Sequence, residues 1–294
     1  MKTPIPIVLL HHSQVQVLLA TVESITKFTK HPYVLFVIDN LSPKSPELIS
    51  AFSDIESKYN GIIIFNKKNN WIRGFNLALK HSSWPKSKYY AFSDADIIVP
   101  NLGSECWLEK MVEQMNMHRC IGKLGLNLDL GNLKKNPKLQ KSYEAELRLL
   151  KGETIGTNII AGVDTTMALY RDDFFVSDFK FRIGHQSLQK PYYYICRTSA
   201  KLSAIHVGWD FYPGAGEKSY SVEKHWSKAW TMCKMGTYVA PEIMMEFGIL
   251  RRCQLRFAQY SIKMLHFFKV FGMISWYVIK HLPRKINEIQ SRVR

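Results

Sequence analysis

The hydrophobic residues of the first hundred positions follow two alternating patterns. Short apolar runs rich in β-branched and aromatic residues, such as residues 5–10 and 33–38, are typical of buried strands. Between these runs, apolar side chains recur every three or four positions, which predicts amphipathic helices. The predicted strands are residues 5–10, 33–38, 61–65 and 89–93, and the predicted helices are residues 14–30, 46–59 and 72–81.

The alternation of strands and helices predicts an α/β fold with a mostly parallel, Rossmann-like sheet flanked by helices. Ligands of such sheets bind beyond the carboxyl ends of the strands. Asp39 and the triplet Asp94-Ala95-Asp96 each follow a predicted strand. The sequence therefore predicts a nucleotide site at this edge of the sheet.

The pattern is less regular beyond residue 100. Residues 107–117 and the segment after Pro137 have helical character, and residues 162–170 and 202–207 are predicted strands. His206 lies near the end of the last of these strands. The second half is thus predicted to continue the α/β fold with fewer regular elements.

The net charge and the cysteine pattern limit the possible binding partners and the cellular compartment. The chain of 294 residues carries a formal net charge of +16, which calls for an anionic partner such as nucleic acid, a phospholipid surface or a phosphorylated substrate. The five cysteines lack CxxC pairing, which is typical of reduced thiols in a cytoplasmic protein. The apolar run at residues 5–10 is too short for the core of a signal peptide.

Two aspartates two positions apart after a strand have a specific chemical use. Both carboxylates can approach one hard divalent cation, and Mg²⁺ or Mn²⁺ binds carboxylate and phosphate oxygens together. A metal bound in this way makes a diphosphate a better leaving group. The alternative is that Asp94 and Asp96 are helix caps or solvated loop residues.

Four segments in the first hundred residues resemble one enzyme family. Residues 88–100 combine an apolar strand, Asp-x-Asp, an apolar run and proline. Residues 6–13 resemble an opening strand, and residues 35–42 resemble a strand that ends in an acidic residue. Residues 65–79 resemble a donor-binding loop and the helix that follows it. Together they resemble the GT-A glycosyltransferases, especially the family 2-like group. The Asn-x-Gly spacing of that donor loop is altered here to Asn70-Trp-Ile-Arg-Gly74.

The resemblance implies a GT-A catalytic domain at residues 1–248, with a nucleotide-sugar-binding half at 1–100 and an acceptor half at 101–248. It implies a metal-dependent, inverting glycosyltransferase that uses a nucleotide-sugar donor, a UDP-sugar being favoured. The implied acceptor is a glycan or glycolipid such as a lipopolysaccharide, a capsule or a lipid-linked saccharide.

The same resemblance assigns residues to the donor and the metal. His206 would be the third metal ligand beside Asp94 and Asp96, and a purely structural histidine is the alternative. Arg73 would reach the diphosphate or else be a solvated surface residue, and Asn76 would bridge the loop and the helix or else only cap it. The implied donor-binding residues are His12, Ser13, Asp39, Asn70, Arg73, Asn76 and Asp94.

An inverting transferase needs a carboxylate that takes the proton from the acceptor hydroxyl. The candidates are Asp164, Asp210 and Glu217, and each has a structural role as its alternative. Asp164 is placed first because the neighbouring Gly162 leaves room for an acceptor.

The last 44 residues hold ten lysines and arginines, interleaved with aromatic and aliphatic residues, and Glu288 is their only acid. The uncharged run at 270–279 is short of the ~20 residues that span a bilayer. Residues 249–294 are therefore predicted to form a basic amphipathic helical region on an anionic membrane surface, on the inner face of the cell membrane. A helix packed on the catalytic domain is the alternative.

Two other functions compete with glycosyl transfer. A sugar nucleotidyltransferase would carry a Gly-rich phosphate loop after the first strand, where this chain has His11-His12-Ser13-Gln14. A nucleic-acid-binding protein would fit the charge, but no binding motif is present and the basic residues lie in an apolar tail. No nucleic-acid partner is expected.

Overall fold

The structure is a computed structural model of the chain. It describes residues 2–69, 71–172, 175–176, 181–182, 193–211, 226, 229–230, 244–245, 247–261, 268, 271–272 and 275, with some side chains within these ranges excepted. The chain divides into two compact units, Met1–Glu217 and Lys218–Arg294. The domain boundary predicted at residue 248 stays a prediction.

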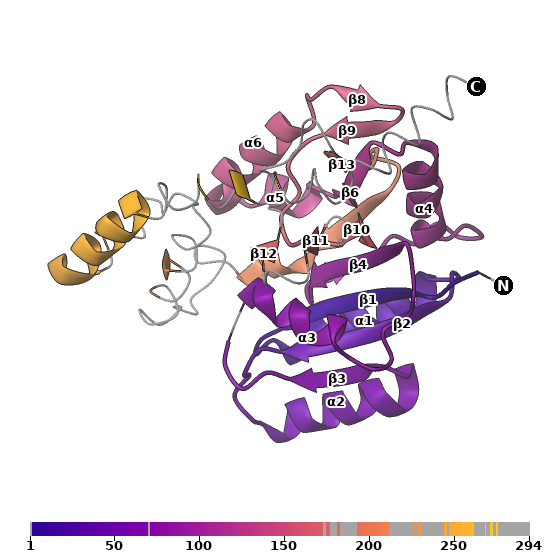
Figure 1. Ribbon diagram of the computed structural model, residues 1–294, viewed down its shortest axis with the longest axis horizontal. Helices are drawn as coiled ribbons and strands as arrows, with labels where there is room; N and C mark the ends of the chain where they lie inside the picture. The colour runs from indigo at the N-terminus through magenta and orange to yellow at the C-terminus, as the bar shows by residue number, and fades with distance from the viewer. Residues whose placement is uncertain are drawn as a thin grey trace. The chain divides into compact units, whose positions relative to one another are not determined.

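The first unit is built on a nine-stranded sheet in the order β3-β2-β1-β4-β10-β6-β13-β9-β8 (Figure 1). Its first-half elements are β1 (Ile5–His11), α1 (Val15–Phe28), β2 (Tyr33–Asp39), α2 (Pro46–Tyr59), β3 (Ile62–Phe65), a 3₁₀ turn (Trp71–Gly74), α3 (Phe75–Leu79) and β4 (Tyr89–Asp94). Strands β1 to β4 are parallel to one another wherever they pair, as the sequence predicts. The predicted strand-helix alternation is confirmed over these residues.

Local signals explain where these elements begin and end. Helix α2 starts after Ser45, whose Oγ accepts a hydrogen bond from the Leu48 amide at 3.1 Å, and Pro46 occupies the first turn. It ends at Tyr59 and is followed by Asn60, which adopts a left-handed conformation with φ 52°. The helix predicted at 72–81 is shorter than expected, because residues 71–74 form a 3₁₀ turn.

Antiparallel pairs enter the sheet in the second half. Strand β10 (Ala168–Arg171) lies between β4 and β6 (Ile121–Gly125) and is antiparallel to both. The other elements of this half are β5 (Ile97–Ile98), α4 (Trp107–Met117), β7 (Asn127–Leu128), α5 (Gly131–Lys135), a 3₁₀ turn (Pro137–Leu139), α6 (Gln140–Leu149), β8 (Thr154–Ile155), β9 (Asn158–Ile160), β11 (Phe175–Val176), β12 (Phe181–Arg182), β13 (Tyr194–Arg197), β14 (Ser203–His206) and a 3₁₀ turn (Val207–Phe211). Strands β5, β14 and β7 form a separate three-stranded sheet.

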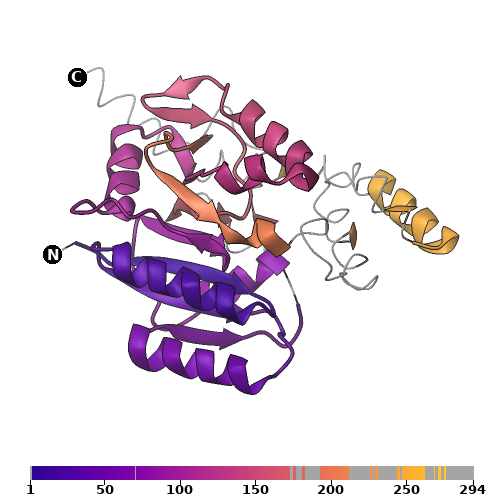
Figure 2. The same ribbon diagram turned by 180° about the vertical axis from the view of Figure 1, so that it is seen from behind.

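The large sheet buries apolar side chains on both faces. Along β1, Ile7 and Leu9 pack with residues of α1, α2 and α4, whereas Val8 and Leu10 pack with Phe75 of α3 on the opposite face. Helix α1 accordingly lies in front of the sheet in Figure 2. Burial on both faces explains why the sequence of β1 is an almost continuous apolar run.

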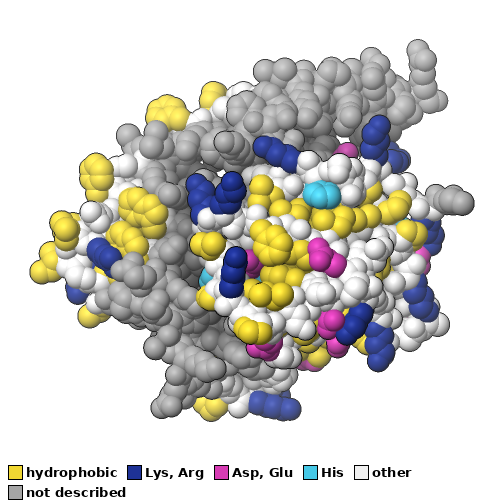
Figure 3. Space-filling view, turned by 90° about the horizontal axis from the view of Figure 1, so that it is seen from below, with side chains coloured by type: hydrophobic (Ala, Val, Ile, Leu, Met, Phe, Trp, Pro, Cys, Tyr) yellow, Lys and Arg dark blue, Asp and Glu magenta, His cyan; other side chains and the backbone are white. Residues whose placement is uncertain are grey.

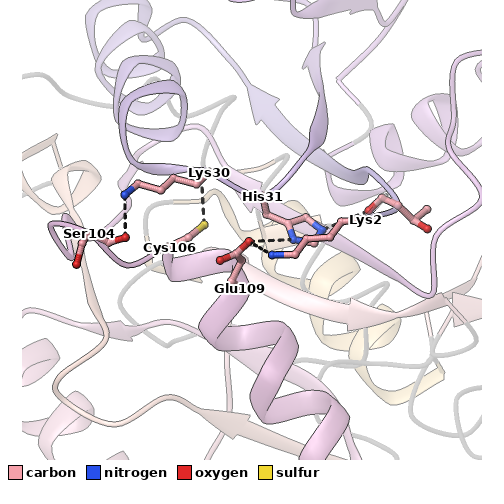
Figure 4. A network of polar contacts seen from close by, with 7 residues as sticks. Lys2, Lys30, His31, Ser104, Cys106 and Glu109 are labelled. Carbon is pink, nitrogen blue, oxygen red and sulfur yellow. Dashed lines mark hydrogen bonds and ion pairs between the residues drawn. The ribbon is translucent and has the colours of Figure 1, made fainter.

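A polar network fastens the start of α4 to the first half of the chain (Figure 4). The Lys30 amide donates to Cys106 Sγ at 3.2 Å, and Lys2 pairs with Glu109. Glu109 also lies 3.8 Å from Nδ1 of the buried His31. These contacts join segments that are far apart in sequence.

None of the helices that the structure describes combines the length and the apolar character needed to cross a membrane.

Candidate functional site

The carboxyl ends of β1 and β2 carry a connected group of polar residues. Asp39 is buried and accepts hydrogen bonds from the Ser42 amide at 3.3 Å and from the Ser42 hydroxyl. Ser42 Oγ in turn accepts from the Ser13 amide at 2.8 Å. Ser13 has a φ of 71°, so the loop after β1 turns sharply toward this group. The structure thus brings Ser13 and Asp39 together through Ser42. Ser42 is a residue that the sequence reasoning missed.

His11, the last residue of β1, is a second residue that the sequence reasoning missed. It pairs with Asp39 in the sheet register and is only 2% exposed. Burial lowers the pKa of His11 to about 4, although the Asp39 carboxylate opposes that shift. His11 is therefore neutral at pH 7. Its position at the end of an apolar strand was the available signal.

The first aspartate of the triplet is held by the loop before β10. The Asp94 amide donates to the Thr165 carbonyl at 2.7 Å, and the Thr165 hydroxyl donates to Asp94 Oδ2. The next amide, that of Ala95, donates to the Leu10 carbonyl at 2.9 Å. The turn after β4 is therefore tied both to β1 and to residues 161–167.

The second aspartate faces His206. Strand β14 pairs with β5 so that His206 lies opposite Ile97, and Asp96 Oδ2 is 3.9 Å from His206 Nε2. The His206 ring stacks on Trp209 with centroids 4.7 Å apart, which fixes its plane. The structure therefore brings Asp96 and His206 face to face, and the pairing of β5 with β14 creates this approach.

Burial raises the pKa of the Asp96 carboxyl, the neighbouring His206 lowers it, and Asp164 adds a further raising effect. Asp96 Oδ1 and His206 Nδ1 are buried and make no hydrogen bond to the described residues. An anionic carboxylate in such a place needs a compensating positive charge. The pair has the donor atoms, one carboxylate and one imidazole, that a divalent cation takes.

Gly208 is the reason that Asp96 fits beside the 3₁₀ turn. A Cβ at this position would lie 2.1 Å from Asp96 Oδ2 and 2.8 Å from His206 Cε1. Only glycine, which has no Cβ, leaves space at this position for the Asp96 carboxylate as observed. Sequence reasoning gave no role to Gly208, because the close approach depends on the β5–β14 pairing.

Asp164 lies in the same region, in the exposed part of the loop before β10. The loop is held by Lys123 of β6, whose fully buried ammonium donates to the carbonyls of Val163 at 2.6 Å and Asp164 at 3.1 Å. The ammonium also lies 5.0 Å from the centre of the Tyr170 ring. A buried lysine therefore positions the backbone that carries Asp164 and Thr165.

The remaining predicted residues are less informative. Asn76 lies in α3 and is partly buried, and His12 follows β1, where its charge contributes to the lowered pKa of His11. Asn70 and Glu217 lie outside the described residues, as do the side chains of Arg73 and Asp210. Their predicted roles stay predictions.

Among the described residues, no group of three His, Cys, Asp or Glu side chains is arranged to hold a metal ion. Asp96 and His206 form a facing pair, while Asp94 Oδ2 accepts a hydrogen bond from Thr165. The three-ligand set predicted from the resemblance therefore stays a prediction.

The sequence model of glycosyl transferase family 2 matches residues 7–177, which include β1 from its third residue onward, β2, β4 and the Asp94-Ala95-Asp96 triplet. The chain belongs to glycosyl transferase family 2. A search of curated proteins finds no match.

Solved glycosyltransferases share the fold of this family 2 chain. A mannosyltransferase from Pyrobaculum calidifontis, PcManGT, solved with GDP-Man and Mn²⁺, superposes with a TM-score of 0.52 at 9% identity over 96% of this chain and 81% of its own. GalNAc-T7, solved with UDP, GalNAc and Mn²⁺, gives a TM-score of 0.50 at 12% identity over 88% of this chain and 55% of its own. The predicted GT-A-like mixed α/β fold is confirmed.

Proposed function

We propose that this family 2 glycosyltransferase moves a sugar from a nucleoside diphosphate donor, a UDP-sugar being favoured, to a saccharide acceptor, in a reaction that requires Mn²⁺ or Mg²⁺. The observation that carries the proposal is the facing pair Asp96 and His206, which lies beside Asp94 at the carboxyl edge of the sheet. Ligands of open α/β sheets bind at this edge. The Mn²⁺ in the complexes of PcManGT and GalNAc-T7 supports a metal of the same class here.

The proposed site of the donor nucleoside is at the carboxyl ends of β1 and β2. Ser42 fixes the orientation of the Asp39 carboxylate, which would accept a hydrogen bond from a ribose hydroxyl or a base N–H. The turn at Ser13 leaves its hydroxyl without a hydrogen bond to the described residues, so it can serve the donor. His12, Asn70, Arg73 and Asn76 complete the proposed donor contacts.

Asp96 and His206 are the proposed metal ligands, and Asp94 contacts the ribose or shares the metal. When bound, the cation neutralises charge on the diphosphate and makes it a better leaving group. The aromatic stacking of His206 on Trp209 and the space left by Gly208 keep the two ligand groups facing each other.

Asp164 is the proposed base for an inverting reaction. Its side chain is exposed, and it lies near enough to Asp96 to raise the pKa of that carboxyl. From this loop its carboxylate would accept the proton of the attacking hydroxyl. Asp210 and Glu217 are the other candidates for this role.

The proposed acceptor is a lipopolysaccharide, a capsule or a lipid-linked glycan at the cytoplasmic leaflet. The basic composition of residues 249–294 supports this choice, because an anionic membrane surface would hold the enzyme beside such an acceptor.

A panel of nucleotide-sugars tests the proposal without knowledge of the acceptor. The matching donor, with Mn²⁺ or Mg²⁺, should be hydrolysed slowly and should raise the melting temperature by about 5 °C at a hundredfold excess over its Kd. Asp96→Ala should lose both responses. Asp54→Ala, which removes a partly exposed carboxylate of α2 paired with Lys58, is the matched control and should keep both. If no nucleotide-sugar stabilises the protein with metal present, the proposed function is wrong.

A further inference from the structure

The described helix at residues 249–261, in the second unit, has two separate apolar faces. One face is packed: Leu255 and Ala258 are buried, and they cluster with Ala229, Met244 and Phe247. This cluster shows which side of the helix faces the interior of its own unit.

The other apolar face is exposed. Ile249, Leu250, Phe257 and Tyr260 are 79%, 74%, 76% and 82% exposed. At about 100° per residue these four side chains fall within an arc of about 100°, centred about 160° from the packed face. The described residues of this unit accordingly show yellow side chains beside blue ones at the left of Figure 3. We call Ile249, Leu250, Phe257 and Tyr260 the outer stripe.

Basic residues border the outer stripe. Arg256 is exposed and falls beside Ile249 and Tyr260 on the helical wheel. Arg252 lies farther along the same flank and donates to the Phe247 carbonyl at 2.5 Å. Arg252 and Arg256 therefore give this flank of the helix a positive charge, and the last 44 residues as a whole contain ten basic residues and one acid.

The combination selects one kind of partner. The aliphatic and aromatic side chains of the outer stripe do not bind the phosphates of nucleic acid, which are bound by polar and charged groups. A second copy of the helix would bring cationic flanks together, which opposes association. An anionic bilayer accepts both parts, the apolar side chains below the headgroups and the arginine among them.

We propose that the outer stripe inserts into the interface of an anionic lipid bilayer, with Arg256 among the lipid headgroups. The inference rests on the proposed placement of the enzyme at a membrane, and it does not depend on the transfer chemistry. It assigns that placement to one face of one helix rather than to the charge of the tail.

Vesicle co-sedimentation of the full chain tests the assignment. Wild type should sediment with vesicles that mix phosphatidylcholine and phosphatidylglycerol, and much less with phosphatidylcholine alone or at high salt. The double variant Phe257→Ser/Tyr260→Ser should lower the partition coefficient by about tenfold or more, since each ring contributes apolar burial. Arg256→Gln should lower it by about fivefold on the mixed vesicles.

A matched control replaces exposed apolar residues elsewhere. Phe65 and Met117, in the first unit, are 66% and 69% exposed, and the variant Phe65→Ser/Met117→Ser should sediment like wild type. The stripe variant should keep its circular dichroism spectrum and its metal-dependent donor hydrolysis in solution. Failure of hydrolysis in wild type would overturn the proposed function and leave this inference standing.

Three outcomes would overturn the inference. They are a wild type that stays in the supernatant with both vesicles, a stripe variant that sediments like wild type, and a concentration-dependent oligomer that the stripe variant abolishes in the absence of lipid. The last result would assign the stripe to a second copy of the chain.

Discussion

Substitution of Gly208 by alanine probes the site at its most crowded point. The added Cβ would lie 2.1 Å from Asp96 Oδ2, whereas ordinary contacts begin near 3.4 Å. The carboxylate must therefore move by about 1 Å, and a displacement of that size costs about 100-fold in rate when the group positions a reacting centre. His206 Cε1, at 2.8 Å from the same Cβ, would be pushed as well.

The substitution should leave the fold intact. Gly208 is not among the glycines with positive φ, and alanine is compatible with the 3₁₀ turn that contains it. We expect kcat for metal-dependent donor hydrolysis to fall by about 100-fold, with a weaker dependence on Mn²⁺ concentration and an almost unchanged circular dichroism spectrum.

Gly248→Ala is the matched control, because a Cβ at Gly248 would meet no atom within 4 Å. It should keep the wild-type kcat and the wild-type metal dependence. A Gly208→Ala enzyme with wild-type kcat and metal dependence would refute the idea that the position of the Asp96 carboxylate governs the reaction.

Three further predictions follow from the same site. Asp96→Ala should abolish hydrolysis of the donor more completely than Asp94→Ala, because Asp96 is the proposed direct ligand; comparable kcat values in the two variants would contradict this ranking. The free energy of unfolding should fall by about 3 kcal/mol as the pH drops from 6.5 to 4, because over this range His11 binds a proton in the unfolded chain and stays largely neutral in the folded one. His11→Gln should remove this part of the pH dependence of stability, measured by chemical denaturation, and an unchanged profile would show that His11 is not responsible. Lys123→Met should lower kcat for transfer while leaving donor KM near wild type, because the lost hydrogen bonds free the backbone of Asp164. Lys123→Arg should recover part of kcat if the cation rather than the packing matters, and steady-state kinetics with the identified donor and acceptor would distinguish these cases.

Local patterns in the sequence were sufficient to predict the first half of the fold. The apolar runs at 5–10, 33–38 and 89–93 became β1, β2 and β4 with small changes at their ends, and the helical spacing at 14–30 and 46–59 became α1 and α2. Parallel strands separated by helices leave few arrangements of the sheet. That restriction is why the sequence alone predicts Asp39 and Asp94 at one edge of the sheet, where the structure has them.

The sequence alone thus determined the alternating elements, the edge at which polar residues gather and the presence of an Asp-x-Asp triplet after a strand. Only the tertiary structure decided which groups meet there. The approach of His206 to Asp96 depends on the pairing of β14 with β5, the contact of Thr165 with Asp94 depends on β10 lying beside β4, and the need for Gly208 exists only once these strands are paired. The physical reason is that periodicity records how each segment meets the core, whereas such contacts join segments whose separation along the chain leaves no local signature.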